Sequence, residues 1–393
     1  MTAGLARAQG NVAYFDIWRA LSSQAVLVGH ALNIFLPAYF MSQRADGSFE
    51  ASRPMLYIQN VGVVVFFALS GYLVTRAVSR RLDDPAYSIR QFAIDRTTRI
   101  FVPFLPAVAL VWVFDSLLLG AGAWNAFSDL PLDAWTLLTN CLMLFNNPAL
   151  SIGAKLTGIG SLYTVPIGTA DPFWTVVLEW WIYVAFGILA LVIGRVPKAT
   201  LLAMPLLLFA LAPPFLSLAS GSGLVLAWPV GMLFALADDS MRNARRGRLA
   251  VVCAFAATFA LLRLLRNGFQ VYDPTVVLGI SVALIGGSFV LRPPGVTQSR
   301  LGRWLLFQSD YSYSLYLVHF SVLIYLAEYL PRTLGPIASI VVGLLLANLV
   351  AACFWFLFER HYLAVRQWAL RAFPGPSQPP PPLAEPRSDR LGV

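Results

Sequence analysis

Residues 335–358 read GPIASIVVGLLLANLVAACFWFLF, a run that contains no charged side chain. A helix needs about 20 mostly apolar residues to cross the hydrocarbon core of a bilayer, so this run is long enough to span it. The chain of 393 residues is 58% hydrophobic and only 12% charged, whereas soluble domains are about 45–50% apolar and about 25% charged. The composition therefore predicts an integral membrane protein.

Further apolar runs recur along the chain. The expected membrane spans are Tyr14–Leu36, Ile58–Val78, Phe101–Leu119, Phe173–Gly194, Thr200–Leu218, Gly223–Ala237, Leu249–Leu265, Thr275–Leu291, Tyr311–Leu330 and Gly335–Phe358. Only helices and closed barrels satisfy their backbone hydrogen bonds in lipid. The sequence therefore predicts an all-α fold, a polytopic membrane bundle of about ten transmembrane helices.

The basic residues indicate the orientation of this bundle. The net charge is +9, but no basic stripe interleaved with aromatic residues predicts a nucleic-acid partner. With the N-terminus inside, the segments from Arg76 to Arg99 and from Arg242 to Arg248 become cytoplasmic, as the positive-inside rule requires. Arg263 and Arg266 are an exception at an outer helix end. We predict a multi-pass protein of the cell (inner or plasma) membrane with both termini cytoplasmic.

The spans divide the chain into three parts. Residues 1–13 form a cytoplasmic N-terminus, residues 14–372 the membrane domain, and residues 373–393 a proline-rich cytoplasmic tail that we expect to be disordered. Residues 120–172 form the largest extracytoplasmic loop, in which Trp135–Leu150 is too short to span and is interpreted as re-entrant or interfacial. The three cysteines form no CxxC or Cys/His cluster, so no disulfide framework and no metal are expected.

The first expected helix carries polar residues along one face. Arg19 and His30 are eleven residues apart, which returns to within about 20° of the start and is about 16 Å along the axis. Asp16, Ser23 and Asn33 fall near the same stripe. Ionisable side chains are costly in a bilayer, so a shared polar face indicates a functional cavity. The alternative is that Arg19 reaches the cytoplasmic surface beside Asp16 and that His30 makes a structural helix contact.

Two later helices repeat this pattern. Thr175, Glu179 and Tyr183 recur at intervals of four and share a face. Tyr316 and His319 follow Ser312 at offsets of four and three, as the wall of a polar groove would. Structural alternatives remain, because the carboxylate can bond a neighbouring helix and the tyrosines can form an interfacial belt.

Arg96 and Arg99 immediately precede the third expected span. Guanidinium groups match phosphate oxygens, so a coenzyme that carries several phosphates can dock there from the cytoplasm. The alternative is ordinary topological charge against anionic lipid.

Together these residues resemble the acyltransferase-3 family of membrane-bound O-acyltransferases, which includes bacterial O-antigen and exopolysaccharide acetyltransferases. The resemblance extends from Asp16 to Glu359. The matching positions, in the order of the family's motifs, are Asp16, Arg19 and His30; Phe66, Phe67, Ser70 and Gly71; Arg96, Arg99 and Pro103; Trp174, Thr175, Glu179 and Tyr183; Ser312 to His319; and Glu359. Thr175 replaces a serine, and Trp180 and Trp181 replace a second carboxylate and a glutamine. These tryptophans argue against paired carboxylates and favour a more apolar acceptor pocket.

The resemblance implies an acyl-CoA donor, by default acetyl-CoA, and an acceptor hydroxyl on a sugar, glycan or glycosylated metabolite. A neutral histidine suits removal of the hydroxyl proton, so we predict His30 as the base. Arg19 would hold a donor phosphate or stabilise developing negative charge, and Glu179 would orient the histidine or the acceptor. Arg96 and Arg99 would bind the coenzyme phosphates. The residues expected to line the substrate site are Asp16, Ser70, Tyr183, Tyr316 and His319.

Two other functions fit the same composition. A proton-coupled secondary transporter would also bury arginine, histidine and glutamate in about ten helices. Such transporters commonly show inverted repeats with broken helices at matching positions, and no convincing pairing is found here. A noncatalytic scaffold of a polysaccharide export complex is the second alternative, but it would not need an arginine and a histidine on one buried face. The sequence leaves the oligomeric state open; membrane lipid is the expected surrounding.

Overall fold

Each apolar segment predicted to span the membrane overlaps a helix in the computed structural model. The structure describes residues 2–36, 41–43, 49–51, 58–84, 87–119, 132–194, 200–266, 270–291 and 299–374. The helices that carry these segments are α1 (Thr2–Phe35), α3 (Ile58–Ser79), α4 (Ile89–Leu119), α7 (Phe173–Gly187), α8 (Thr200–Ala219), α9 (Ala227–Leu236), α11 (Arg246–Arg266), α12 (Pro274–Val290), α14 (Ser312–Tyr329) and α15 (Pro336–Leu357). The helical class is therefore confirmed.

The remaining elements are short. They are β1 (Met41–Gln43) and β2 (Phe49–Ala51), which pair antiparallel, and the helices α5 (Ala134–Cys141), α6 (Pro148–Thr157), α10 (Asp238–Asn243), α13 (Arg300–Asp310) and α16 (Tyr362–Ala372). Single turns or irregular turns are η3 (Gly160–Leu162), η4 (Ile188–Ile193, a π-helix that continues α7), η6 (Gly223–Leu226), η8 (Arg332–Leu334) and η9 (Glu359–His361).

Six helical segments in the described part of the chain are long and apolar enough to cross a membrane. They are Ile58–Ser79, Ile89–Leu117, Phe173–Ile193, Thr200–Ala219, Arg246–Arg266 and Pro336–Ala372. Gly223–Leu236 and Pro274–Val290 are shorter apolar helices, and α1 and α14 are not among the six. The chain is thus a helical membrane protein, while the count of ten spans and the cytoplasmic termini stay predictions.

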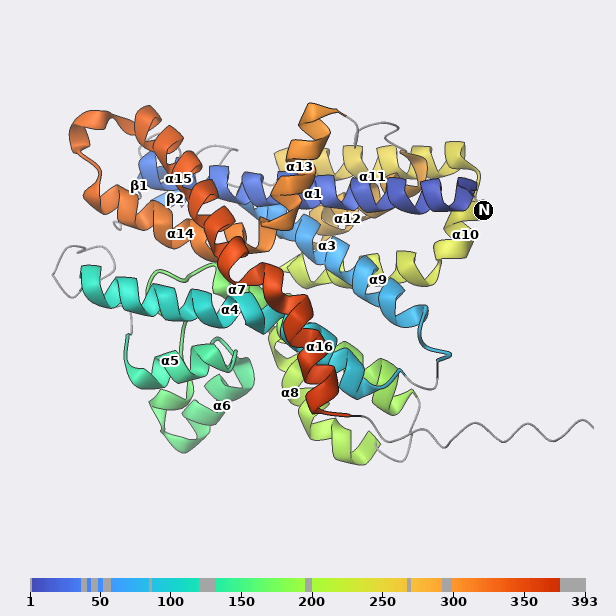
Figure 1. The fold of residues 1–393 in the computed structure, drawn as a ribbon, viewed down its shortest axis with the longest axis horizontal. Helices are drawn as coiled ribbons and strands as arrows, with labels where there is room; N and C mark the ends of the chain where they lie inside the picture. The colour runs from blue at the N-terminus through green and yellow to red at the C-terminus, as the bar shows by residue number, and fades with distance from the viewer. Residues whose placement is uncertain are drawn as a thin grey trace, which may run out of the picture.

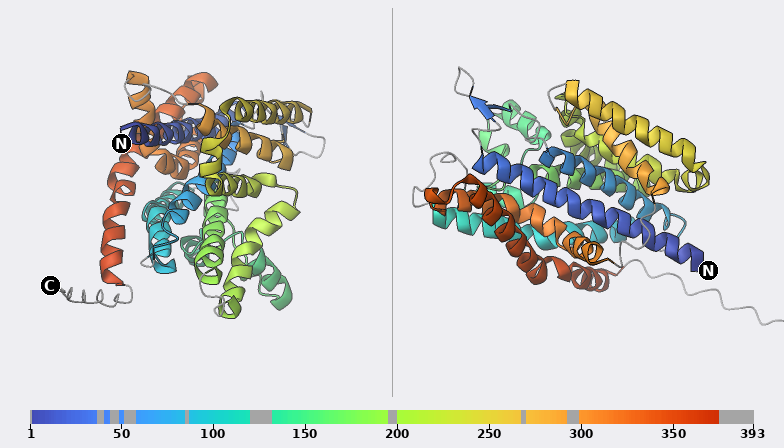
Figure 2. Two further views of the ribbon diagram at one scale, coloured as in Figure 1. Left: turned by 90° about the vertical axis from the view of Figure 1, so that its right-hand side faces the viewer. Right: turned by 90° about the horizontal axis from the view of Figure 1, so that it is seen from above.

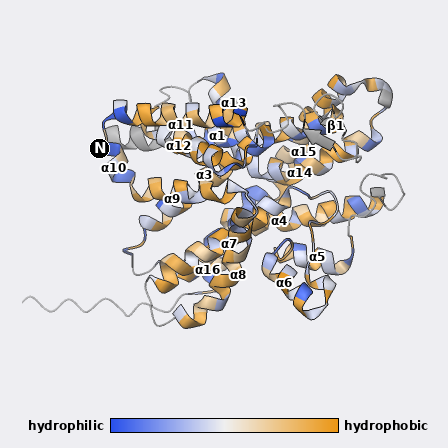
Figure 3. Cartoon of the chain, turned by 180° about the vertical axis from the view of Figure 1, so that it is seen from behind, coloured by the Kyte–Doolittle hydropathy of each residue, from blue (hydrophilic) through white to orange (hydrophobic). Residues whose placement is uncertain are grey.

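The helices differ in how much of their apolar surface is buried, as expected for a bundle surrounded by lipid. Most of α3 is buried, and it packs against α1, α9 and α12. By contrast α8 and α11 expose apolar side chains, among them Leu202 at 86% and Phe255 at 71%. Figure 3 shows this hydrophobic colouring along the helices. In Figures 1 and 2 the axes of α1, α11 and α12 are nearly aligned, while α8 leans away. Exposed apolar surface on this scale fits contact with lipid.

Close packing of α3 on α9 depends on two glycines. A Cβ on Gly71 would overlap the carbonyl oxygen of Trp228, and a Cβ on Gly231 would overlap that of Ala68. Small residues let membrane helices approach this closely.

We therefore expect Gly71→Ala to lower the stability of the protein by roughly 1–3 kcal/mol, because the two backbones must separate. Gly247→Ala in α11 is the matched control, since no atom of the described residues lies within 4 Å of the position of its Cβ. Thermal unfolding of both variants in detergent measures the difference. Equal melting temperatures for Gly71→Ala and wild type would contradict the close contact.

Two predicted helix starts lie far from the observed ones. Helix α4 begins at Ile89 and not at Phe101, so Arg96 and Arg99 lie on the helix and not in a loop before it. Helix α1 begins at Thr2 and not at Tyr14. The reason is that hydropathy reports which residues suit lipid, whereas a helix continues through polar residues for as long as its backbone bonds are satisfied.

The predicted re-entrant segment is broken into two helices. Helix α5 is capped by Asp133, whose side chain accepts hydrogen bonds from the backbone N–H groups of Trp135 and Thr136. The chain then turns through Met143 and Asn146, both with positive φ, before α6 begins. The helix break does not place this segment relative to the membrane, so its re-entrant or interfacial position stays a prediction. Most of the loop before it, residues 120–131, and the tail from residue 375 lie outside the described residues.

Candidate active site

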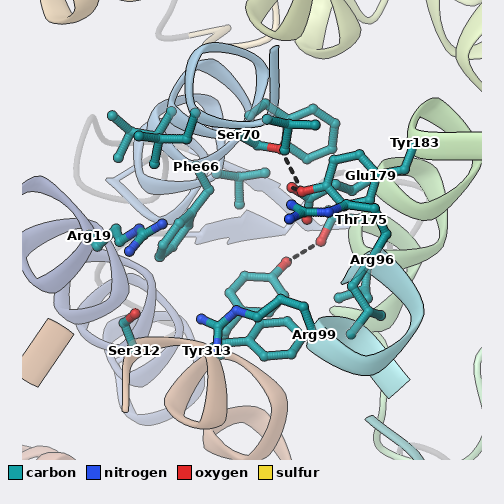
Figure 4. A pocket seen from close by; sticks show the side chains of 18 residues that line it. Arg19, Phe66, Ser70, Arg96, Arg99, Thr175, Glu179, Tyr183, Ser312 and Tyr313 are labelled. Carbon is teal, nitrogen blue, oxygen red and sulfur yellow. Dashed lines mark hydrogen bonds between the residues drawn. The ribbon is translucent and has the colours of Figure 1, made fainter. Parts of the chain in front are cut away.

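Polar and charged side chains from five helices converge on one cavity inside the bundle. Its volume is about 160 Å³. The polar lining comprises Arg19 of α1, Ser70 of α3, Arg96 and Arg99 of α4, Thr175, Glu179 and Tyr183 of α7, and Ser312, Tyr313 and Tyr316 of α14. Arg19 approaches from the side opposite Glu179 and Thr175 (Figure 4). A cluster of this kind among apolar helices is expensive, so it indicates a site.

The wall formed by α7 is a hydrogen-bonded row. Its three polar residues are four positions apart, so all of them face the cavity. The hydroxyl of Tyr183 donates to Oε1 of Glu179 at 2.6 Å and lies 2.7 Å from Oγ of Ser70 on α3. The hydroxyls of Thr175 and Tyr316 are hydrogen-bonded to each other, and each lies 3.1 Å from the carbonyl oxygen of Pro172. Because each hydroxyl has one hydrogen, one of them donates to the other, which in turn donates to this carbonyl. The bond from Tyr183 fixes the orientation of the glutamate.

The three arginines of the cavity are not equivalent. Arg99 pairs with Oε1 of Glu359 at 2.9 Å. That glutamate is only 1% exposed and also accepts from the backbone N–H and the hydroxyl of Ser314, at 3.0 and 2.6 Å. Arg19 pairs with Asp16 at 3.3 Å, where both side chains are partly exposed.

Arg96 has its charge available. Its guanidinium lies over the ring of Tyr183, 5.8 Å from the centroid. Within the described residues no carboxylate is in ion-pair distance of it, and its buried Nε has no hydrogen-bond partner. An arginine that is held by an aromatic ring and lacks an anion is suited to an anionic ligand.

The two candidate histidines lie together outside this cavity lining. The ring centroids of His30 on α1 and His319 on α14 are 5.3 Å apart. Tyr316, which lines the cavity, is 5.8 Å from His319 by the same measure. Nδ1 of His319 lies 3.0 Å from the carbonyl oxygen of Leu315 and 2.9 Å from that of Tyr316. Because carbonyl oxygens only accept, Nδ1 carries the proton and Nε2 is left as an acceptor.

The structure thus brings together most of the residues that the sequence singled out. Seven of them line the cavity: Arg19, Ser70, Arg96, Arg99, Glu179, Tyr183 and Tyr316. His30 and His319 form a pair beside Tyr316, and Asp16 contacts Arg19 without lining the cavity. Trp180 and Trp181 do not line it either. Trp180 packs against Phe101, and Trp181 donates to the carbonyl of Met143.

Sequence reasoning missed Asp115. It is fully buried in α4 and accepts hydrogen bonds from the N–H of Thr169 at 2.6 Å and the hydroxyl of Tyr325 at 2.5 Å. These bonds tie the segment before α7 to α4 and α14. A signal was present, because a carboxylate inside an apolar span is a functional candidate by default. No local signal identified Glu359 as the partner of Arg99.

A family model described as an acyltransferase domain matches residues 12–356, nearly the whole chain. No curated protein and no solved structure matches.

Proposed function

Because the chain belongs to the acyltransferase-3 family of acyltransferase domains, we propose that it transfers an acyl group, by default acetyl, from acyl-CoA to a hydroxyl of a sugar, glycan or glycosylated metabolite. The observation that carries this proposal is the cavity in which Arg19, Arg96 and Glu179 converge next to a histidine pair. It supplies cationic groups for a phosphorylated donor and imidazoles for proton transfer within one membrane domain.

The donor occupies the arginine end of the site. Arg96 contacts the coenzyme phosphates most directly, since its charge has no carboxylate partner among the described residues. Arg99 contributes through its remaining N–H groups, because Glu359 holds part of its guanidinium. Arg19, across the cavity, holds a further phosphate.

His30 acts as the general base. The acceptor hydroxyl oxygen attacks the thioester carbonyl carbon while His30 takes the hydroxyl proton. The carbon–sulfur bond then breaks, and the coenzyme thiolate takes this proton from His30, so the products are an ester and free coenzyme. Glu179, fixed by Tyr183, orients the acceptor or the histidine. No metal is required for these steps.

We propose that the protein lies in the inner or plasma membrane of the cell and crosses it with ten transmembrane helices. Both termini then lie in the cytoplasm. This orientation places Arg96 and Arg99, near the start of α4, on the side where acyl-CoA is available. It also places residues 120–172 on the opposite side.

The test is the chemical product. Membranes that contain the protein receive acetyl-CoA with an isotopic label in the acetyl group, and mass spectrometry follows labelled esters in envelope glycans and secreted metabolites. We expect labelled ester only when the protein is present. Proton-coupled solute uptake without any labelled ester would support the transporter alternative.

We expect Arg96→Ala to raise the KM for acetyl-CoA by roughly tenfold or more, because a charge-assisted hydrogen bond contributes about 1.5–3 kcal/mol. The control is Arg366→Ala, since Arg366 pairs with Asp95 and does not line the cavity. Steady-state kinetics with varied acetyl-CoA measure both variants. An unchanged KM in Arg96→Ala would remove this arginine from the donor site.

A further inference from the structure

Three buried hydrogen-bond acceptors on residues in the region of His30 have no donor among the described residues. They are Oδ1 of Asn33 on α1, Oε1 of Gln59 on α3 and Nε2 of His319 on α14, and none has a hydrogen-bond partner within the described protein. His319 is 1% exposed. A buried acceptor left unpaired costs about 1–3 kcal/mol, so three in one region need an explanation.

These residues extend the walls of the cavity. Gln59 is eleven residues from Ser70 on α3, just as His30 is eleven from Arg19 on α1, and eleven residues return to nearly the same helix face. His319 follows Tyr316 by three on α14. Each of these helix faces therefore continues beyond the cavity. On α1, His30 lies about 16 Å from Arg19 along the helix axis.

Direct contacts hold the three residues around one point of α1. A Cβ on Gly29 would lie 2.8 Å from the backbone nitrogen of Gln59 and 2.9 Å from its Cβ, so Gln59 packs against the neighbour of His30. Asn33 is one turn further along α1, and the ring of His319 faces that of His30. The three acceptors thus come from three helices and lie within about one turn of His30 on α1: the ring of His319 contacts His30 itself, Gln59 packs at Gly29, and Asn33 lies one turn on.

The three unpaired acceptor atoms indicate which kind of ligand can bind to them. All three atoms accept, given the proton on Nδ1 of His319. A phosphate or carboxylate would offer them only further acceptors, whereas a ligand with several hydroxyl groups offers donors. We propose that Asn33, Gln59 and His319 form the acceptor subsite and bind neighbouring hydroxyl groups of a sugar-like molecule, with the reacting hydroxyl at His30. This rests on the proposed function and places the phosphates of the donor at the arginine end of the site and the acceptor at the opposite end, where the thioester meets the hydroxyl at His30.

Stability tests the subsite without knowledge of the acceptor. Gln59→Met and Asn33→Leu keep similar volume and remove the unpaired acceptors, so we expect melting temperatures equal to or above that of wild type. Asn348→Leu is the matched control, because Oδ1 of Asn348 accepts from Gln24 at 2.7 Å and from Tyr311 at 3.0 Å. That variant should melt lower. If Gln59→Met and Asn33→Leu melt as low as the control, their acceptors are bonded within the protein and the proposal fails.

Kinetics test the ligand. Purified wild type and variants receive labelled acetyl-CoA and are titrated with the glycan extract of the native cells. We expect Gln59→Met and Asn33→Leu each to raise the half-saturating extract concentration roughly 3- to 10-fold, the effect of one lost neutral hydrogen bond, with the acetyl-CoA KM unchanged. An unchanged extract dependence in stable variants would mean that these atoms bind only water, which overturns the proposal. Absence of transfer by wild type would instead overturn the proposed function.

Discussion

Replacement of His30 by alanine is expected to lower the rate of acyl transfer by about 10²–10⁴-fold, the usual contribution of a positioned general base. The effect should fall on kcat and not on the KM for acetyl-CoA, because His30 does not line the arginine end of the cavity. Among the described residues, its ring contacts are with His319 and with Phe320, at centroid distances of 5.3 and 5.0 Å. The measurement is the initial rate of label transfer, normalised to folded protein in the membrane.

The chain provides a matched control for this prediction. It contains three histidines, and the third, His361, is exposed in η9 beside Arg360. His361→Ala should therefore transfer acyl groups at the wild-type rate. A correctly inserted His30→Ala protein with wild-type turnover would exclude His30 as the base, whatever the behaviour of the control.

Loss of Glu359 should produce the largest change in stability. Its carboxylate is buried and pairs with Arg99, which also lies over the ring of Tyr362, 4.8 Å from the centroid. Glu359→Leu leaves this arginine without its anion and Ser314 without an acceptor. We expect a loss of about 3 kcal/mol, the lower end of the range for a broken buried pair, because Arg99 is partly exposed. Thermal unfolding in detergent measures it.

A double variant distinguishes the stabilising effect of the Arg99–Glu359 ion pair from the role of Arg99 in donor binding. Replacing both partners, in Arg99→Met with Glu359→Leu, removes the uncompensated charge, so most of the lost stability should return. Glu328→Ala is the control, since Glu328 forms no ion pair with any described residue. A double variant no more stable than Glu359→Leu would contradict the assignment of the loss to an unpaired arginine. Its acetyl-CoA KM would also report how far Arg99 contributes to donor binding.

Part of the site could be predicted because it depends on one helix at a time. The apolar run predicted as Ile58–Val78 is observed as Ile58–Ser79, and the four-residue spacing of Thr175, Glu179 and Tyr183 turns all three into the cavity. Hydropathy and helical periodicity are local properties, so they identify helices and their polar faces without knowledge of the partners.

What the sequence by itself determined, then, is a membrane protein of apolar helices, some with one polar face, in an order that resembles the acyltransferase-3 family. Only the tertiary structure decided which polar faces meet. Arg99 pairs with Glu359, 260 positions away in the chain, so Arg96 is the cavity arginine whose charge is available. His30 packs against His319 in the same way. The physical reason is that periodicity fixes the direction of a side chain from its own helix, whereas its partner depends on how separate helices pack.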